Sequence, residues 1–350
     1  MKQITWPDAS RFKSLPLPNI KSTKETGASI LSTSTKSSNA GDFSALPFDI
    51  LTKIAASFTS PDIQAASLVC RSWRDALRPL REAMIFLRWG KRFKHGQGVR
   101  RNLVKALDSF LKGASRGSTL AMVDAGLVCW EMGRKEKAIA LYCKAAELGD
   151  PAGQCNLGIS YLQAEPPKQK EAMKWLSQAA IAGHVRAQYQ LALCLHQGLG
   201  VDHNLQEAAK WYLKAASGGY VRAMYNVALC YSVGEGLSVN RQQARKWMKR
   251  AADRGHSKAQ FEHGRGLFSE GEMMKAVVYL ELATRSGEAA AAHVKNIILQ
   301  QISTTTRNHV MVLADSHCAL SSSHRVLQNQ RLLQGSLAGR QSSYKNQQAK

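Results

Sequence analysis

The sequence predicts an all-α fold, in which three short helices precede an α-solenoid of about six helical hairpins and disordered tails lie at both ends. One short pattern of alanine, a large apolar residue, paired small residues and glycine recurs six times between Trp89 and Ala291. Recurrence at such a period is typical of stacked helical repeats. Before the repeats, about 40 residues carry the apolar spacing of short helices, and both chain ends are rich in serine.

Each copy of the pattern predicts the second helix of a hairpin. The closing glycines are 32, 34, 36, 36 and 32 residues apart. In the fourth copy Ala208, Trp211, Ala215 and Ala216 share one helical face, and Gly219 follows as a C-terminal stop. We expect the aligned tryptophans to be buried between successive hairpins, where replacing one by alanine would cost about 3 to 5 kcal/mol. They are Trp175, Trp211 and Trp247.

The first helix of each unit precedes a loop that is rich in glycine. Residues 96–99, 198–201 and 234–237 have a G-x-G sequence, and glycine permits the backbone angles of a tight loop. This loop, the K/E-A-x-x-W-Y/L-x-x-A-A string and the G-x-x-x-A string after it resemble the Sel-one-like repeat, a relative of the tetratricopeptide repeat. The resemblance implies a solenoid that holds other proteins together and does not catalyse a reaction.

Composition divides the chain into four segments. Residues 1–44 are rich in serine, threonine and lysine and predict a disordered segment, with an organelle transit peptide as the alternative. Residues 45–88 carry the three short helices, and residues 89–300 carry the repeats and a last capping helix. Residues 301–350 are basic and rich in serine, glutamine and asparagine, so we expect a disordered basic tail.

The segment of short helices begins at Leu46. Its first helix has apolar residues at Leu51, Ile54 and Phe58, and a turn at residues 60–62 leads to a second apolar run. So few residues bury too little surface to be stable alone. The apolar face therefore predicts a partner.

The strings L-P-x-D-I-L-x-x-I, S-P-D-I and A-S-L-V-C-R-S-W-R-D-A-L resemble the F-box between Leu46 and Leu77. The resemblance implies docking onto the Skp adaptor subunit of SCF ubiquitin ligases, while the neighbouring domain selects the substrate. It places eight residues at the docking surface or in the small core beneath it: Leu46, Pro47, Ile50, Leu51, Ile54, Val69, Cys70 and Trp73.

An alternative is that these residues only cap the N-terminal end of the solenoid, since solenoids need caps. The segment from Leu80 to Trp89 contains neither proline nor glycine. We therefore expect the last F-box helix to continue into the first repeat and to join the two modules rigidly.

The formal net charge of +23 is distributed as +3 over residues 1–45, +2 over 46–88, +12 over the repeats and +6 beyond them. Such a charge could attract nucleic acid, an anionic membrane or an acidic protein. Because we find no basic motif interleaved with aromatic residues, we interpret the cations as solvated outward helix faces. We therefore expect neither a nucleic-acid partner nor a membrane partner.

Other classes of site lack their sequence signals. The chain has no phosphate loop, G-x-S-x-G elbow, H-E-x-x-H motif or paired cysteines. We therefore expect no catalytic residue, cofactor or metal. The absence of a long apolar run or secretory signal predicts an intracellular protein, cytoplasmic or nuclear. Cys194 and Cys230 occupy equivalent repeat positions and should be buried.

Three hypotheses follow. The first is a substrate-recognition subunit of an SCF-type ubiquitin ligase, which binds the Skp adaptor through the F-box and an unknown target protein through the solenoid. The second is a scaffold that bridges proteins independently of a ligase. The third is a basic solenoid that binds nucleic acid.

Overall fold

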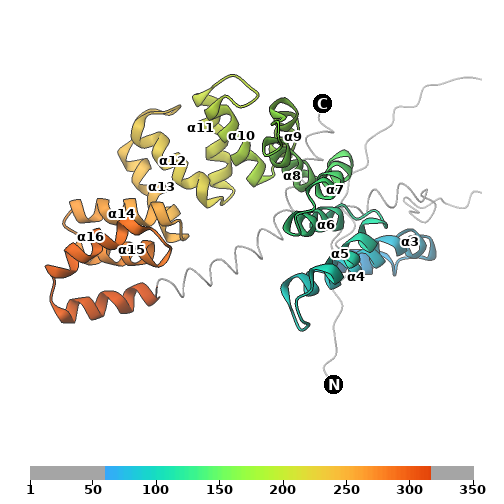
Figure 1. The fold of residues 1–350 in the computed structure, drawn as a ribbon, viewed down its shortest axis with the longest axis horizontal. Helices are drawn as coiled ribbons and strands as arrows, with labels where there is room; N and C mark the ends of the chain where they lie inside the picture. Colours follow the sequence, from blue (N-terminus) through green and yellow to red (C-terminus); the bar gives the residue numbers. More distant parts are fainter. Residues whose placement is uncertain (1–59, 317–350) are drawn as a thin grey trace, which may run out of the picture. The chain divides into compact units, whose positions relative to one another are not determined.

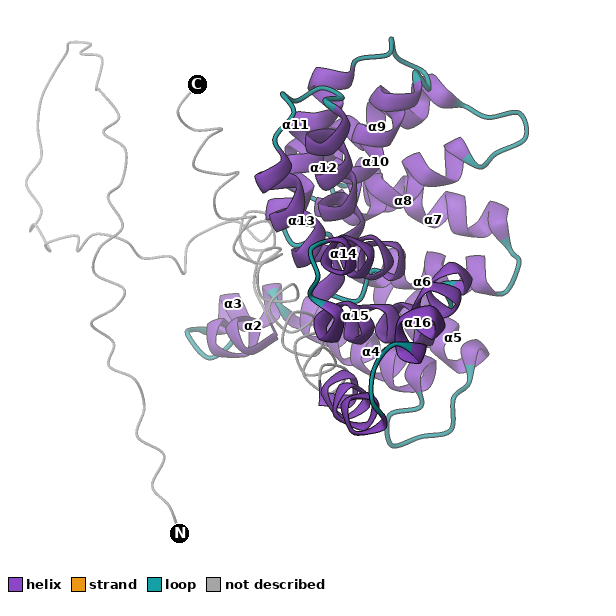
Figure 2. Cartoon of the chain, turned by 90° about the vertical axis from the view of Figure 1, so that its left-hand side faces the viewer, coloured by secondary structure: helices purple, strands orange, loops and turns teal. Residues whose placement is uncertain are grey.

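The computed structural model describes residues 60–316, and these residues form helices joined by loops and contain no strand (Figure 2). This confirms the predicted all-α class. None of the helices in this part of the chain is both long and apolar enough to cross a membrane. The helices are α2 (Ser60–Ala66), α3 (Arg71–Ala76), α4 (Arg78–His95), α5 (Leu103–Ala114), α6 (Thr119–Glu131), α7 (Lys135–Glu147), α8 (Pro151–Leu162), α9 (Gln169–Ile181), α10 (Val185–Gln197), α11 (Leu205–Ser217), α12 (Val221–Val233), α13 (Arg241–Asp253), α14 (Ser257–Ser269), α15 (Met273–Arg285) and α16 (Ala289–Gln300).

From α4 to α15 the helices pair as hairpins in chain order. The pairs with the most extensive packing are α4 with α5, α6 with α7, α8 with α9, α10 with α11, α12 with α13 and α14 with α15. The second helix of each pair packs on the first helix of the next, and Figure 1 shows neighbouring helices in this order. Residues 60–316 therefore contain the six hairpins that the repeated pattern predicts.

Three of the loops inside hairpins share one construction. Each ends at an asparagine whose side-chain oxygen accepts a hydrogen bond of 2.9 Å from the backbone N–H three residues later and so caps the second helix; the three are Asn102, Asn204 and Asn240. In the third loop Gly234 has φ +93° and Gly236 has φ +72°, which are left-handed values. Glycine is required at Gly236 for a second reason, which is space. A Cβ atom on Gly236 would lie 2.1 Å from the carbonyl oxygen of Leu205. A Cβ atom on Gly200 would likewise lie 2.6 Å from the carbonyl oxygen of Gln169, so the second and third of these loops pack closely on the preceding hairpin.

The buried face of the second helices differs by one position from our prediction. In α9, Ala172 and Ala179 are fully buried as expected, but the large side chain between them that is fully buried is Leu176. Trp175 is only partly buried. The same holds in α11, where Tyr212 is 2% exposed and Trp211 is half-buried. Trp175, Trp211 and Trp247 pack against the core, but the prediction that they are fully buried is wrong.

The facing first helix explains which side chain is buried. A Cβ atom on Gly158 of α8 would lie 2.7 Å from Leu176 Cγ, and one on Gly126 of α6 would lie 2.4 Å from a ring carbon of Tyr142. The residue four positions after the first alanine therefore fills the space that a glycine leaves. The indole beside it reaches the surface, where the Lys214 amine lies 3.9 Å from the ring centroid of Trp211.

The repeat cysteines lie where the sequence predicts them. Cys194 is 1% exposed and Cys230 is 5% exposed, and both are free thiols. Burial raises the pKa of each thiol to about 11. Both therefore act as small apolar core residues with little thiolate at neutral pH.

The segment after the repeats corrects the predicted tail. Residues 304–316 are helical, and Val310 and Ala314 in this segment are fully buried. The rest of the predicted tail, like residues 1–44, lies outside the described part of the chain.

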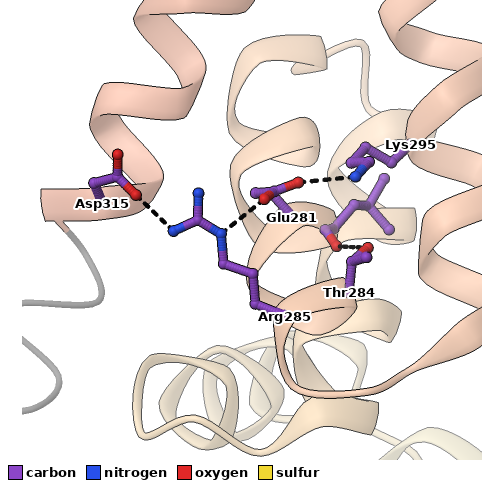
Figure 3. A network of polar contacts seen from close by, with 6 residues as sticks. Glu281, Thr284, Arg285, Lys295 and Asp315 are labelled. Atoms are coloured by element: carbon purple, nitrogen blue, oxygen red, sulfur yellow. Dashed lines mark hydrogen bonds and ion pairs between the residues drawn. The ribbon is translucent and has the colours of Figure 1, made fainter.

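A polar network joins this last helical segment to the repeats (Figure 3). The Glu281 side chain is 8% exposed and accepts hydrogen bonds from Lys295 Nζ at 2.9 Å and Arg285 Nε at 2.7 Å. Arg285 Nη1 also donates to Asp315 at 2.6 Å. Burial opposes ionisation of Glu281, but its two cationic partners hold its pKa below the usual value. The carboxylate is thus paired, which is the condition for burying a charge at low cost.

Two histidines cap helices at the start of hairpins. The backbone N–H groups of Ala187 and Ala259 donate to Nδ1 of His184 and His256, each at 3.2 Å. Such a cap requires an imidazole whose Nδ1 is unprotonated. Burial lowers the pKa of His184 from 6.5 to about 4 and also lowers that of His256.

We predict that Leu176→Ala destabilises the solenoid by about 2 to 5 kcal/mol, because it leaves a cavity between α8 and α9. Trp175→Ala should cost less, since that ring is only partly buried. Urea unfolding of the two variants checks the order, and a larger loss from Trp175→Ala would contradict the assignment of the buried position.

We predict that His184→Asn reduces the loss of stability in acid. The folded chain favours neutral His184, so this contribution is complete above pH 6.5 and is lost as the pH falls towards 4. Asparagine can accept the same capping bond without titrating. The unfolding free energy of the wild type should fall between pH 7 and 4 by about 2 to 3 kcal/mol more than that of the variant. Equal pH profiles from thermal unfolding at each pH would contradict this.

Candidate functional site

A small core of its own lies ahead of the repeats. Ile63 from α2 and Trp73, Ala76 and Leu77 around α3 are at most 9% exposed and pack together. This cluster is separate from the core of the first two hairpins, although Met84 of α4 packs against both. The F-box segment thus has an interior that is distinct from that of the solenoid.

The turn between α2 and α3 exposes two large apolar side chains. Ser67 Oγ donates to the carbonyl oxygen of Ile63 at 2.6 Å. The backbone N–H of Trp73 donates to Cys70 Sγ at 3.5 Å, and this bond caps α3. These bonds fix both ends of the turn. Between them Leu68 and Val69 are each 69% exposed. A pair of exposed apolar residues on a short, fixed turn is a feature of protein-binding surfaces.

The described residues locate three of the eight predicted site residues. Val69 lies on the surface, Cys70 is half-buried at the helix cap, and Trp73 lies in the small core. The other five lie outside the described part of the chain: Leu46, Pro47, Ile50, Leu51 and Ile54. Leu68 was not in the predicted set. Its signal was its place in the A-S-L-V-C-R string, where it precedes Val69.

Helix α4 connects the small core to the first hairpin without a break. Its Glu82 accepts a hydrogen bond of 2.7 Å from Arg116, which follows α5, and one of 3.3 Å from Arg78. The Arg116 guanidinium also lies 4.6 Å from the ring centroid of Phe86. These contacts hold α4 against α5 over its N-terminal half. The predicted continuous helix between the two modules is therefore present.

Comparison with known families supports both modules. The F-box domain model matches residues 43–82, and the Sel1 repeat model matches residues 87–118, 133–150, 151–184, 185–220 and 221–256. F-box protein At1g70590 of Arabidopsis thaliana is 66% identical to this chain over 328 residues, which are 87% of this chain and 93% of that protein. The chain belongs to the F-box proteins with Sel1 repeats. Both resemblances stated from the sequence are confirmed.

Two solved structures share the fold of this F-box protein with Sel1 repeats. One is c5321, a protective antigen of uropathogenic Escherichia coli strains with an SLR fold, with a TM-score of 0.60 and 22% identity over 81% of this chain and 66% of the antigen. The other is a Sel1 repeat protein from Oxalobacter formigenes, with a TM-score of 0.54 and 25% identity over 58% of this chain and 88% of that protein. The likeness shows the solenoid fold.

We predict that a buried F-box residue affects the hydrogen exchange of α2 and α3, whereas the exposed pair does not. Trp73→Ala should destabilise the small core by about 3 to 5 kcal/mol, so that the amides of α2 and α3 exchange with solvent faster. Leu68→Ser with Val69→Ser should leave the amide exchange of α2 and α3 unchanged, because both side chains are already in water. Hydrogen exchange read by mass spectrometry measures both, and faster exchange in the double variant would show that the turn supports the core.

Proposed function

We propose that this F-box protein is the substrate-recognition subunit of an SCF-type ubiquitin ligase. Its F-box docks onto the Skp adaptor, and its Sel1-repeat solenoid binds a target protein. The observation that carries the proposal is the exposed pair Leu68 and Val69, held on a fixed turn within the segment that the F-box domain model matches. The eight residues of the sequence prediction remain the proposed docking set, to which we add Leu68.

The connection through α4 supports a receptor role. A ligase receptor has to hold its target at a defined position relative to the subunit that transfers ubiquitin, and fixed geometry raises the effective concentration of the reacting groups. The helix α4 runs from the F-box core into the first hairpin, and the ion pair of Glu82 with Arg116 joins it to the turn after α5. In this proposal α4 keeps the F-box and the first repeat in a fixed relation to each other.

In this proposal the chain itself is a non-catalytic adaptor that acts inside the cell, in the cytoplasm or the nucleus. Other subunits of the ligase carry out the chemistry. F-box domains and Sel1 repeats are both modules of protein–protein interaction, and neither needs a cofactor for that purpose. We propose no catalytic residue, metal or cofactor for this function.

We predict that the full chain binds purified Skp adaptor and that Leu68→Ser with Val69→Ser weakens this binding at least about tenfold, because apolar anchors dominate such interfaces. Leu46→Ala with Pro47→Ala should do the same. The matched control is Ile181→Ser with Val233→Ser, which removes two equally exposed apolar residues from the repeats and should leave affinity unchanged. Surface plasmon resonance measures all three.

Lack of adaptor binding by the wild-type chain would remove the ligase proposal. The scaffold hypothesis would be favoured if target proteins copurified with the chain but their ubiquitination and abundance in cells did not respond to the Leu46→Ala and Pro47→Ala changes.

A further inference from the structure

The first hairpin carries a cluster of cations around its loop. Between Glu82 and Asp108 the sequence contains seven lysines and arginines and no acidic residue. Three of the cations, Arg100, Arg101 and Lys105, line one hollow of about 580 Å³, together with Phe93, Val99 and Asn102. The hollow lies between the end of α4, the loop of residues 96–102 and the first turn of α5.

The chain contains two internal controls for this loop. The loops that end at Asn102, Asn204 and Asn240 have the same asparagine cap, and the N–H of each asparagine donates to a carbonyl oxygen of the first helix at 2.9 Å. Where the first loop has Arg100, Arg101 and Lys105, the second has Asp202, His203 and Glu207, and the third has Ser238, Val239 and Gln243. Since acidic and neutral residues allow the same loop, its geometry does not require the cations.

The loop that carries these cations is fixed, and two of its three cations at the hollow have no carboxylate partner among the described residues. Arg92 Nε donates to the carbonyl oxygen of Gln97 at 3.1 Å and so fixes the loop from below. Arg101 pairs with Glu131 at 2.5 Å, but among the described residues no carboxylate lies within ion-pair distance of Arg100 or Lys105. Both are exposed. Two unpaired cations therefore face solvent beside a hollow whose loop is fixed.

Aromatic rings lie among these cations, which corrects our earlier interpretation that the basic residues lack aromatic neighbours. Trp89 is 41% exposed and stacks on Phe93, with 5.9 Å between the ring centroids. The Arg92 guanidinium lies 4.7 Å from the Trp89 centroid, and Lys105 Nζ lies 6.0 Å from that of Phe93. The hollow thus combines positive charge with an apolar floor.

We propose that this hollow, formed by Phe93, Val99, Arg100, Arg101, Asn102 and Lys105, binds an acidic peptide segment of a protein partner. Carboxylate or phosphate side chains of the segment would pair with Arg100 and Lys105. This surface differs from the F-box turn, and its role does not depend on adaptor binding. The proposal thus gives a partner of the solenoid a chemical class, namely a protein with an acidic segment.

Charge selects this occupant over others. The parts of this chain outside the structure are themselves basic, with net charges of +3 for residues 1–59 and +5 for residues 317–350, so they are repelled by the hollow. Single-stranded nucleic acid needs ring faces on which bases can stack. Here each ring already has a cation over it and the other ring beside it. An acidic peptide needs only the free cations.

The test uses the full chain and a fluorescent peptide of alternating glutamate and glycine, with binding followed by anisotropy at about 0.15 M salt. Arg100→Ser with Lys105→Gln places the residues of the third loop into the first, so the loop should still fold, which circular dichroism checks. We expect affinity to fall about tenfold. The control, Lys137→Gln with Lys170→Gln, removes the same charge from two exposed sites in the repeats and should change affinity less than about twofold.

Further probes identify the source of the negative charge. A phosphoserine peptide of the same spacing that binds and responds to the Arg100 and Lys105 variant supports the proposal and shows that phosphate is accepted. An equal loss in both variants would overturn it, because the charge of the whole chain would then account for binding. A single-stranded oligonucleotide that binds more tightly than either peptide, and that the same variant weakens, would also overturn it in favour of nucleic acid.

Discussion

The structure depends on the close approach of the two helices in each hairpin. Gly126, Gly158 and Gly264 in the first helices leave no space for a Cβ atom, because a large side chain of the second helix already lies there. In the fourth and fifth hairpins Ala192 and Ala228 take this place and are fully buried. A larger side chain at these positions would separate the helices, and all further packing between hairpins is built on this distance.

The period of the repeats could be predicted from sequence because the alanine pattern and its closing glycines recur along the chain. The identity of the buried side chain could not be predicted as easily. At about 100° per residue, offsets of 0, 4, 7 and 8 span about 100° of the helix surface, whereas offset 3 lies about 60° to the other side of the first alanine. Tryptophan at offset 3 is the larger side chain. The small residue of the facing helix, glycine or alanine, leaves the space that the side chain at offset 4 fills, and the sequence of a single helix does not reveal its partner.

At the candidate site, too, the sequence motif identified the residues but not which of them are buried. The strings that resemble the F-box identified Val69, Cys70 and Trp73 as one group, but their spacing could not separate the exposed Val69 from the buried Trp73. That difference arises because the turn after α2 ends at the Cys70 cap, which points α3 and its tryptophan inward. The helical segment of residues 304–316 was missed for a related reason. Its apolar run from Val310 to Ala314 is short and lies in a stretch that is polar as a whole, and the burial of Val310 and Ala314 comes from tertiary packing.

Repetition allows backbone geometry and surface chemistry to vary separately in this chain. The loop that precedes α5, α11 and α13 needs two glycines with positive φ and an asparagine cap, and these residues are the same in all three copies. The two positions just before the asparagine are exposed in all three copies, so one copy can carry Arg100 where another carries Asp202. A positively charged hollow at the first hairpin therefore costs the solenoid little stability. Among these three loops the first alone has the unpaired cations Arg100 and Lys105. It also has an apolar surface that no preceding hairpin covers, formed by Phe93 with the exposed Trp89 beside it.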